Sequence, residues 1–353
     1  MQMRNFNIAS EIGLLMNHNI YKLITSIHEY KGKQDLYINS KRDVLTGLVS
    51  SAKVHSTSYS NRIEGIFTTD KRVKDIVNER VEPNNRNEEE IAGYRDVLNT
   101  IHDNYEYINI NSNVILQLHR DMYKYSGSSI GGKYKDSQNY IGETQSDGSN
   151  KTRFVPLSPV ETPIAIKELC DSYQEIIKSK EMDPLLAIPI FILDFLSIHP
   201  FNDGNGRLSR LLTLLLLYKS GYIVGKYISI EKIIEESKES YYEALEKSSV
   251  NWNDNNNDYS YFVEYYLGVI LSAYREFSSR VEYITYNKLT SEDRITYIVK
   301  ESEIPFNKSY LMDKCPDISE TTIERSLSNL LKESKIEKIS SGRYTKYKWV
   351  NKD

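Results

Sequence analysis

Cysteine is scarce in this sequence, which holds only Cys170 and Cys315 among 353 residues. Two distant cysteines cannot build the disulfide framework of a small secreted domain, and the chain has no C-x-x-C pair. This usage suits the reducing cytosol, so we expect a cytoplasmic protein. The chain also lacks a Gly-Lys-Ser/Thr phosphate loop, which excludes that common way of holding a nucleotide.

Long apolar runs are missing as well. The N-terminus, MQMRNFNIASEIG, lacks the apolar core of a secretory signal. The longest apolar stretches, 184–198 and 211–218, are interrupted by Asp194, by His199 and by a polar loop, so they are too short or too broken to span a bilayer. They are typical of two buried helices, and we expect no membrane partner.

Neither sign of charge is in large excess. The 45 Lys and Arg side chains nearly balance 49 Asp and Glu, which leaves a net charge of −4. The chain as a whole is therefore not a polyanion binder, and contact with nucleic acid would need a local basic patch.

Apolar residues recur at three- and four-residue steps over most of residues 10–104, as they do in amphipathic helices. Residues 127–157 break this pattern, because extended segments flank SDGSN within a Gly- and Ser-rich stretch, which predicts a β-hairpin. Helix returns after Ser158, a candidate N-cap followed by Pro159, and Asp183-Pro184 repeats this start signal. Two more helical segments follow before residue 282.

The pattern changes again from about Leu289. Three short helices and a basic β-hairpin resemble a winged helix, with Ser319, Thr322 and Arg325 on the exposed face of its third helix. Such a unit can contact DNA, or it can serve only for packing or for dimerisation. The basic residues of the wing are Lys335, Lys338, Arg343, Lys346 and Lys348. The nearby acids that weaken the charge argument are Glu320, Glu324, Glu333 and Glu337.

One short stretch, HPFNDGNGRLSR, carries most of the chemistry. A turn between two buried helices, with the second starting near Gly204, would present free N–H groups and a positive dipole end to an anion. Gly204 and Gly206 let the backbone approach a ligand without a Cβ in the way. Arg207 and Arg210 lie three residues apart on the second helix, so both can face one phosphate group.

The same stretch also holds a base and an acid. Asp203 precedes the glycines, and one carboxylate with phosphate oxygens and waters is a usual way to hold Mg²⁺, with Mn²⁺ as an alternative ion. His199 has the pKa range to take a proton from an attacking hydroxyl. Asn205 can hold the loop or donate to a phosphate oxygen. A lone His is more often a satisfied core residue, but these neighbours favour a site for a nucleoside triphosphate and a metal.

This stretch is similar to the signature of the Fic (filamentation induced by cAMP) family, His-Pro-Phe-x-Asp/Glu-Gly-Asn-Gly-Arg-x-x-Arg, and every fixed position matches. The resemblance in layout runs from about Lys31 to Ser279. It implies an all-α core with a β-hairpin flap that transfers AMP from ATP to a Tyr, Thr or Ser hydroxyl of a target protein or of itself, releasing pyrophosphate. By the same resemblance His199 is the general base and Asp203 the Mg²⁺ ligand.

The resemblance also implies a set of ATP-binding residues and a docking site for the target protein. The hairpin around Tyr140–Gly142 looks like the flap, which pairs with the target's backbone by strand addition. Tyr241 resembles the tyrosine of the adenine pocket, although the family's Asn eight residues later is Ser249 here. The implied ATP-binding residues are Ile141, Gly142, Asp203, Gly204, Asn205, Gly206, Arg207, Arg210 and Tyr241.

A second motif lies upstream. Ser60-x-x-x-Glu64-Gly65 looks like the Fic inhibitory motif, Ser/Thr-x-x-x-Glu-Gly/Asn, although alone it would be an ordinary helix end. Ser60 and Glu64 share one helix face. A Glu64 carboxylate paired with Arg210 would occupy the guanidinium needed by the γ-phosphate, so we expect an autoinhibited adenylyltransferase.

We expect three parts: an N-terminal helical region with the inhibitory helix at 1–105, the Fic core at 106–282, and the winged-helix-like domain at 289–353. A homodimer is a possible partner arrangement. Alternative functions stay open at this point. Glu64 could serve removal of AMP, another nucleotide could be used, or the core could sense nucleotide for a DNA-binding regulator. A Doc-like kinase is disfavoured because that motif has Lys where this chain has Gly206.

Overall fold

The computed structural model describes residues 4, 6–15, 17–40, 42–127, 129–144, 150–286, 290–300, 302, 304–340 and 345–350. The chain forms two compact units. The first contains Met1–Lys31 and Ala52–Tyr274, and the second contains Gly32–Ser51 and Arg275–Asp353. The three-part division 1–105, 106–282 and 289–353 stays a prediction.

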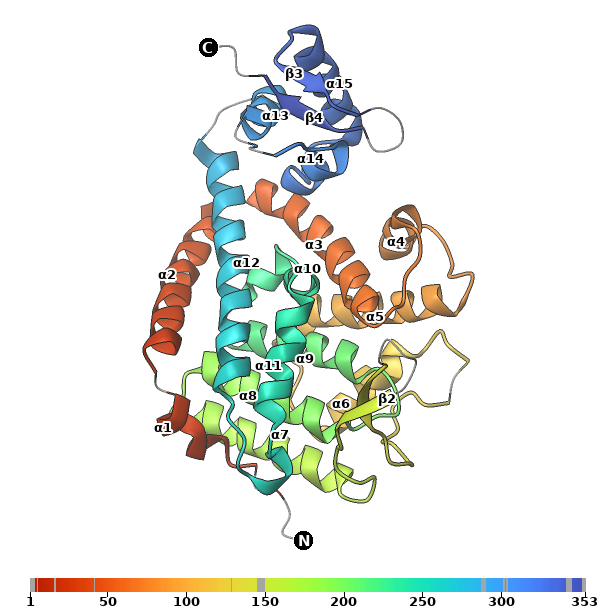
Figure 1. The fold of residues 1–353 in the computed structure, drawn as a ribbon, viewed down its shortest axis with the longest axis vertical. Coiled ribbons are helices and arrows are strands. Elements are labelled where there is room, and N and C mark those ends of the chain that lie inside the picture. Colours follow the sequence, from red (N-terminus) through yellow and green to blue (C-terminus); the bar gives the residue numbers. More distant parts are fainter. Residues whose placement is uncertain are drawn as a thin grey trace. The chain divides into compact units, whose positions relative to one another are not determined.

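The described residues are mostly helical, with two small antiparallel hairpins (Figure 1), which confirms the predicted all-α class. The elements, in chain order, are η1 (Ile8–Glu11), α1 (Ile12–Leu15), α2 (His18–Ser40), α3 (Arg42–Ile63), α4 (Asp70–Val77), α5 (Arg86–Asn104), α6 (Ser112–Met122), β1 (Ile141–Thr144), β2 (Asn150–Phe154), α7 (Thr162–Ser179), α8 (Pro184–Ile198), α9 (Asn205–Lys219), η2 (Ile223–Lys226), α10 (Ile230–Glu236), α11 (Lys238–Ser249), η3 (Trp252–Asp254), α12 (Ser260–Tyr286), α13 (Ser291–Lys300), α14 (Lys308–Lys314), α15 (Glu320–Lys332), β3 (Ile336–Lys338) and β4 (Tyr347–Trp349).

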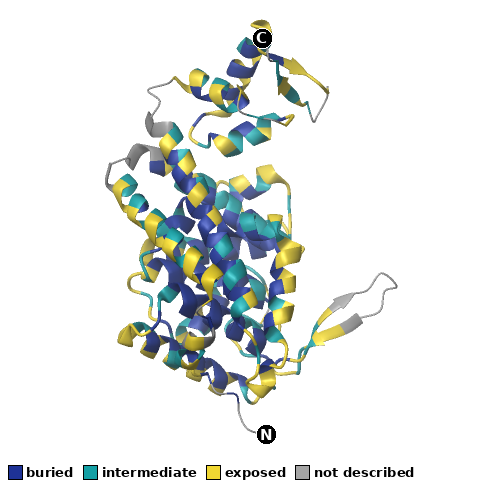
Figure 2. Ribbon diagram, turned by 60° about the vertical axis from the view of Figure 1, so that its left-hand side comes forward, coloured by how far each residue is buried: buried dark blue, intermediate teal, exposed yellow. Residues whose placement is uncertain are grey.

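Helices α8 and α9 form the centre of the first unit. Nearly every residue of both helices is buried, as their apolar sequences predict. Helix α8 packs against α7 and α9, and α5 packs on α9. Figure 2 shows these buried segments enclosed by helices whose outer faces are exposed. The loop that carries the motif therefore joins two helices that the core holds rigidly. No helix in the described part of the chain is both long enough and apolar enough to cross a membrane.

The two predicted helix starts had different outcomes. Asp183 caps α8 as expected, since its Oδ1 accepts a hydrogen bond of 2.8 Å from the backbone N of Leu185. The start at Ser158 is wrong, because α7 begins at Thr162. Thr162 N does donate to Ser158 O at 3.1 Å, but Pro163 has no N–H to bond the carbonyl of Pro159, so this first turn is not continued as regular helix. Ser158 instead forms a turn whose hydroxyl donates to the Glu161 carboxylate at 2.5 Å.

The predicted hairpin is present in the first unit. Strands β1 and β2 pair antiparallel, with Gly142 opposite Thr152 and Thr144 opposite Asn150. Most of the predicted turn, at 145–149, lies outside the described residues. The described ends of both strands stand out from the helical body (Figure 2).

The C-terminal part of the second unit contains the three helices and the hairpin expected from sequence. Strands β3 and β4 pair antiparallel, and Phe306 adds a bridge to Tyr347. The interior of this part is built from Ile295, Val299, Phe306, Leu311, Cys315, Ile318, Ile323, Leu327, Leu330 and Ile336. The wing residue Arg343 lies outside the described residues. The winged-helix assignment and DNA contact stay predictions.

The crossing of α5 and α6 offers a test of this packing. A Cβ on Gly93 would overlap the backbone carbonyl of Met122. We expect Gly93→Ala to lower the free energy of unfolding by about 1–3 kcal/mol, because backbone must move to admit one methyl group. Denaturant unfolding followed by circular dichroism measures this.

Gly268 is the matched control for this substitution. It lies within α12, and a Cβ placed on it would meet nothing within 4 Å. Gly268→Ala should raise stability by up to about 1 kcal/mol, because Ala is the better helix former. Equal stability of wild type and Gly93→Ala would contradict the packing argument.

Candidate active site

The loop from His199 to Gly204 joins the end of α8 to the start of α9. His199 has a left-handed φ of +51°, and its N–H donates to Phe195 O at 3.0 Å, which ends α8. Gly204 has a φ of +82° and caps α9, as predicted from the start near Gly204. Its Cβ position is closed by the Tyr123 hydroxyl, so only glycine fits without displacement.

Asn205 holds this loop closed with both ends of its side-chain amide. Its Oδ1 accepts from Phe201 N at 2.9 Å, and its Nδ2 donates to Phe201 O at 2.7 Å. Of the two roles open for Asn205 in the sequence, the structure supports holding the loop. Its side chain is buried, so only its backbone N–H, in the first turn of α9, is suited to an anion.

The His199 ring is oriented as a base. Its Nδ1 lies 3.2 Å from Leu196 O, and a carbonyl can only accept, so Nδ1 carries the proton and Nε2 is left with the lone pair. The pKa of His199 is lowered to about 4, chiefly by burial and also by the positive charge of Lys135, while the bond to Leu196 O and the charges of Glu64 and Asp203 oppose the shift. The imidazole is therefore neutral at pH 7 and able to accept a proton.

Arg210 is held by the helix that carries the upstream motif. Its Nε donates to Ser60 Oγ, and its Nη2 donates to Ser60 O and to Glu64 Oε1, each at 2.8 Å. Ser60 and Glu64 share one face of the helix end, as their spacing predicts, and Gly65 follows with a φ of +75°. A Cβ on Gly206 would overlap the Glu64 carboxylate. The carboxylate of Glu64 thus lies directly over the first turn of α9.

Arg207 points to a different carboxylate. It pairs with Glu90 at 2.7 Å, and its Nη2 donates to the Tyr123 hydroxyl at 2.8 Å. Within the described part of the chain its buried Nε and Nη1 form no hydrogen bond, so the contact of Nη1 with Glu90 Oε2 is an ion pair without hydrogen-bond geometry. Arg207 also does not border the pocket that Arg210 borders. No spacing in the sequence connects Arg207 with Glu90, which lies on α5, so this pair could not be predicted.

His119 was also missed by sequence reasoning. Its ring stacks on Phe201 with 3.7 Å between centroids. Gly132 N donates to its Nδ1 at 2.9 Å, so its Nε2 carries the proton and donates to Asp203 O at 3.0 Å. Burial lowers the pKa of His119 to about 4, which keeps this neutral form. His119 therefore supports the loop from α6.

Asp203 is the candidate metal ligand. Its side chain is half exposed, and its Oδ1 accepts from Gly204 N at 2.6 Å. The described residues include no group of three or more His, Cys, Asp or Glu that could hold a metal. Asp203 alone fits an ion whose other ligands are phosphate oxygens and waters.

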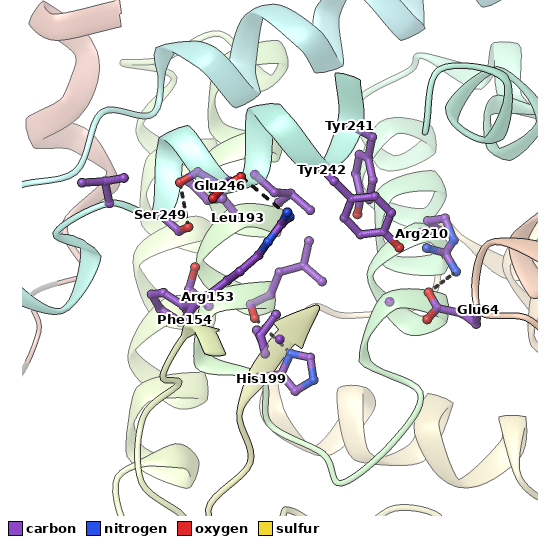
Figure 3. Close-up of a pocket in the computed structure, with 17 residues that line it drawn as sticks. Glu64, Arg153, Phe154, Leu193, His199, Arg210, Tyr241, Tyr242, Glu246 and Ser249 are labelled. Carbon is purple, nitrogen blue, oxygen red and sulfur yellow. Dashed lines mark hydrogen bonds and ion pairs between the residues drawn. The ribbon is translucent and has the colours of Figure 1, made fainter. Parts of the chain in front are cut away.

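A pocket of about 420 Å³ opens beside this loop (Figure 3). The predicted residues that border it are Glu64, Ile141, Gly142, His199, Gly206, Arg210 and Tyr241. Arg153 of β2 and Glu246 of α11 also border it and lie 3.7 Å apart, a pair that the sequence did not indicate. Ser249 borders it too, but its hydroxyl donates to Glu246 O at 3.0 Å.

Residues 109–217 match the Fic/DOC family model. The sequence is 29% identical over 117 residues to protein adenylyltransferase fic-1 of Caenorhabditis elegans, which covers 33% of this chain and 21% of that protein. It is 32% identical over 111 residues to protein adenylyltransferase Fic of Aedes aegypti, covering 31% and 19%. The chain thus spans about a fifth of the length of these curated relatives.

One solved structure has a similar fold over almost the whole of both chains. The structure of a Fic family protein from Desulfovibrio desulfuricans G20 superposes with a TM-score of 0.63 at 21% identity, covering 96% of this chain and 98% of the other. The fold and loop define a helical protein in which a buried two-helix core presents a glycine-capped helix start. The chain contains a Fic/DOC family domain, which confirms the resemblance stated from the motif.

The His199 environment predicts a measurable titration. Nitrogen-15 NMR of the histidine rings should give His199 a pKa near 4, because burial disfavours the imidazolium. The His199→Gln variant assigns the signal by its loss. A His199 pKa at or above the ordinary 6.5 would contradict the neutral-base assignment.

Proposed function

We propose that this chain is an autoinhibited protein adenylyltransferase, which transfers AMP from ATP to a hydroxyl group of a target protein or of itself. One observation carries the proposal. A neutral imidazole, an anion-binding helix start and Arg210 border one pocket, and the Glu64 carboxylate lies in the place suited to a phosphate. The matched relatives are named protein adenylyltransferases, which supports this choice of chemistry.

In this proposal His199 Nε2 takes the proton of the target hydroxyl. The hydroxyl oxygen then bonds to the α-phosphorus, the bond from that phosphorus to the oxygen bridging the β-phosphate breaks, and pyrophosphate leaves. The N–H groups at the start of α9 and the Arg210 guanidinium stabilise negative charge on the phosphates. Tyr241 and the apolar part of the pocket hold the adenine base.

Asp203 would hold Mg²⁺, which would neutralise phosphate charge when bound. The hairpin would hold the target. Ile141 and Gly142 border the pocket, and an extended segment of a target could pair with β1 by backbone hydrogen bonds. That pairing positions a hydroxyl without reading much of the target's sequence. Cys170 and Cys315 are both free thiols, which suits the cytoplasmic location we propose.

Glu64 would inhibit by competing for Arg210. Arg210 is almost fully buried, so its pairing with Glu64 is screened little by water. ATP would have to break that pair, and the γ-phosphate would meet negative charge over Gly206. Glu64 is about a third exposed, at 34%, so its side chain can move away without unfolding the site.

Removal of the Glu64 carboxylate tests the proposal. Glu64→Gly should increase AMP incorporation from labelled ATP by about tenfold or more, because each 1.4 kcal/mol of lost competition corresponds to a factor of ten. Adding His199→Ala to Glu64→Gly should abolish the incorporation, since the base is then missing.

Glu79 provides the matched control, because it is also a glutamate in the turn that follows a helix, but it is exposed away from the pocket. Glu79→Gly should leave AMP incorporation at the wild-type level. Equal activity of wild type and Glu64→Gly would contradict inhibition by Glu64. Activity that survives His199→Ala would contradict the proposed base.

Removal of AMP is the second candidate function, favoured by the position of Glu64 at the same pocket as His199. A carboxylate that is partly exposed to this pocket can orient a water. An AMP-modified target should then lose AMP with the wild-type chain and keep it with Glu64→Gly. Release at equal rates by both would exclude Glu64 from that reaction.

DNA-binding regulation is the weaker alternative. On α15, the expected recognition helix, Glu320 and Glu324 are both within 2.8 Å of Lys308. Lys335 likewise pairs with Glu333 at 2.7 Å. These ion pairs partly neutralise Lys308 and Lys335, which weakens the charge argument for contact with phosphate.

A further inference from the structure

A short segment before the hairpin holds the backbone of the loop that carries His199. Lys135 Nζ donates to Ile198 O at 2.9 Å, and Lys135 N donates to Pro200 O at 2.9 Å. Asn139 Nδ2 donates to Phe201 O at 3.0 Å and lies 3.4 Å from His199 O. Lys135 and Asn139 together contact the carbonyls of four consecutive residues, of which Phe201 O also accepts from Asn205 Nδ2 at 2.7 Å.

Those four carbonyls need partners because of where they lie. The last carbonyls of α8 have no intrahelical donor, and the chain turns sharply at the left-handed His199. Buried carbonyls without donors would be costly. The segment around Lys135 therefore fixes the direction in which the His199 backbone, and hence its ring, leaves α8.

Lys135 occupies this position at an electrostatic cost. It is only 3% exposed, and burial lowers the pKa of its ammonium to about 8. In the described part of the chain no carboxylate lies within ion-pair distance of its Nζ, and Glu161 acts on it only from farther away. Its bond to Asn139 Oδ1, at 3.1 Å, joins the two donors into one unit. Burial of a charged group is costly unless the group is hydrogen-bonded. Here backbone carbonyls, and not an acid, supply the acceptors for the Lys135 ammonium.

The same segment reaches both arms of the hairpin. Gln138 Nε2 donates to Asn139 O at 3.1 Å and to Pro156 O at 3.0 Å. Asn139 lies two residues before β1, and Pro156 lies two residues after β2. The base of the hairpin and the donors that hold the His199 loop therefore belong to one hydrogen-bonded segment.

We propose that Lys135 and Asn139 are positioning residues that hold His199 for proton transfer and link its placement to the hairpin. This rests on the proposed adenylyltransferase function. The charge on Lys135 also faces His199, together with the charges of Glu64 and Asp203. Loss of that positive charge should raise the pKa of His199, because the imidazolium then meets less repulsion.

The test compares three variants in the Glu64→Gly background. Lys135→Met removes the donor and the charge but keeps the chain length, and it should lower kcat by about a hundredfold, as expected for a misplaced base. The KM for ATP should stay within about twofold, since Lys135 does not border the pocket. Lys135→Arg should recover much of kcat. Asn139→Asp replaces the side-chain donor with a charged acceptor, which cannot bond the loop carbonyls, and it should also lower kcat.

Lys133→Met is the matched control, because it changes an exposed lysine two residues away and should leave kcat unchanged. Circular dichroism establishes that each variant folds. If Lys135→Met does not fold, Asn139→Asp decides the proposal. Wild-type kcat in Lys135→Met or Asn139→Asp, or an equal loss in Lys135→Met and Lys135→Arg, would overturn the proposal.

A second readout does not need catalysis. In ring NMR, Lys135→Met should raise the pKa of His199 and move the acid limb of kcat/KM to higher pH, whereas Lys135→Arg should leave both in place. If the Glu64→Gly protein transfers no AMP, the proposed function fails, but the NMR comparison still tests the positioning role. An unchanged His199 pKa in folded Lys135→Met would overturn it.

Discussion

The contact between Arg210 and the end of α3 is the interaction on which the site depends. A guanidinium that is almost fully buried binds the hydroxyl and carbonyl of Ser60 and the carboxylate of Glu64. These bonds satisfy the charge without any ligand. They also place a carboxylate over Gly206, where an anion would otherwise use the helix dipole. Any phosphate that enters must replace an internal partner that already fits.

The loop beside this contact joins two helix ends of opposite polarity. The end of α8 presents carbonyls, and Lys135 and Asn139 meet them with donors. The Glu64 carboxylate lies over the start of α9, and its hydrogen bond is with Arg210 Nη2. The end of α8, which Lys135 and Asn139 bond, is buried. The start of α9, over which Glu64 lies, opens to the pocket. In the proposed function the donors on the α8 side would stay in place, whereas Glu64 would be replaced by a phosphate.

The sequence was sufficient to predict those features that depend on residues close together in the chain. Two apolar runs around a Gly-rich motif predicted the loop between α8 and α9, and the four-residue spacing of Ser60 and Glu64 predicted their common face. The sequence could not identify contacts between side chains that only tertiary packing brings together. Glu90 is distant in the chain from Arg207, and Lys135 resembles any other lysine until its burial is known. The wrong prediction of where α7 begins has a local cause, because Pro163 interrupts the helical hydrogen bonds that would follow a start at Ser158.

The two arginines of the motif show why spacing alone is a limited guide. Both arginines lie on α9, three residues apart, and were expected to face one anion. Arg210 pairs with Glu64, whereas Arg207 pairs with Glu90 and also lies 3.8 Å from Asp203. Glu90 is buried and also accepts from Arg86 at 2.9 Å, so it is held from two sides. Glu64 pairs only through one oxygen with Arg210 among the ion pairs of the described residues, and a third of its side chain is exposed. A charge that is held twice and buried is costly to displace, while a singly held, partly hydrated one is not. An incoming triphosphate would therefore exchange with Glu64 at Arg210, while Glu90 keeps Arg207 in place.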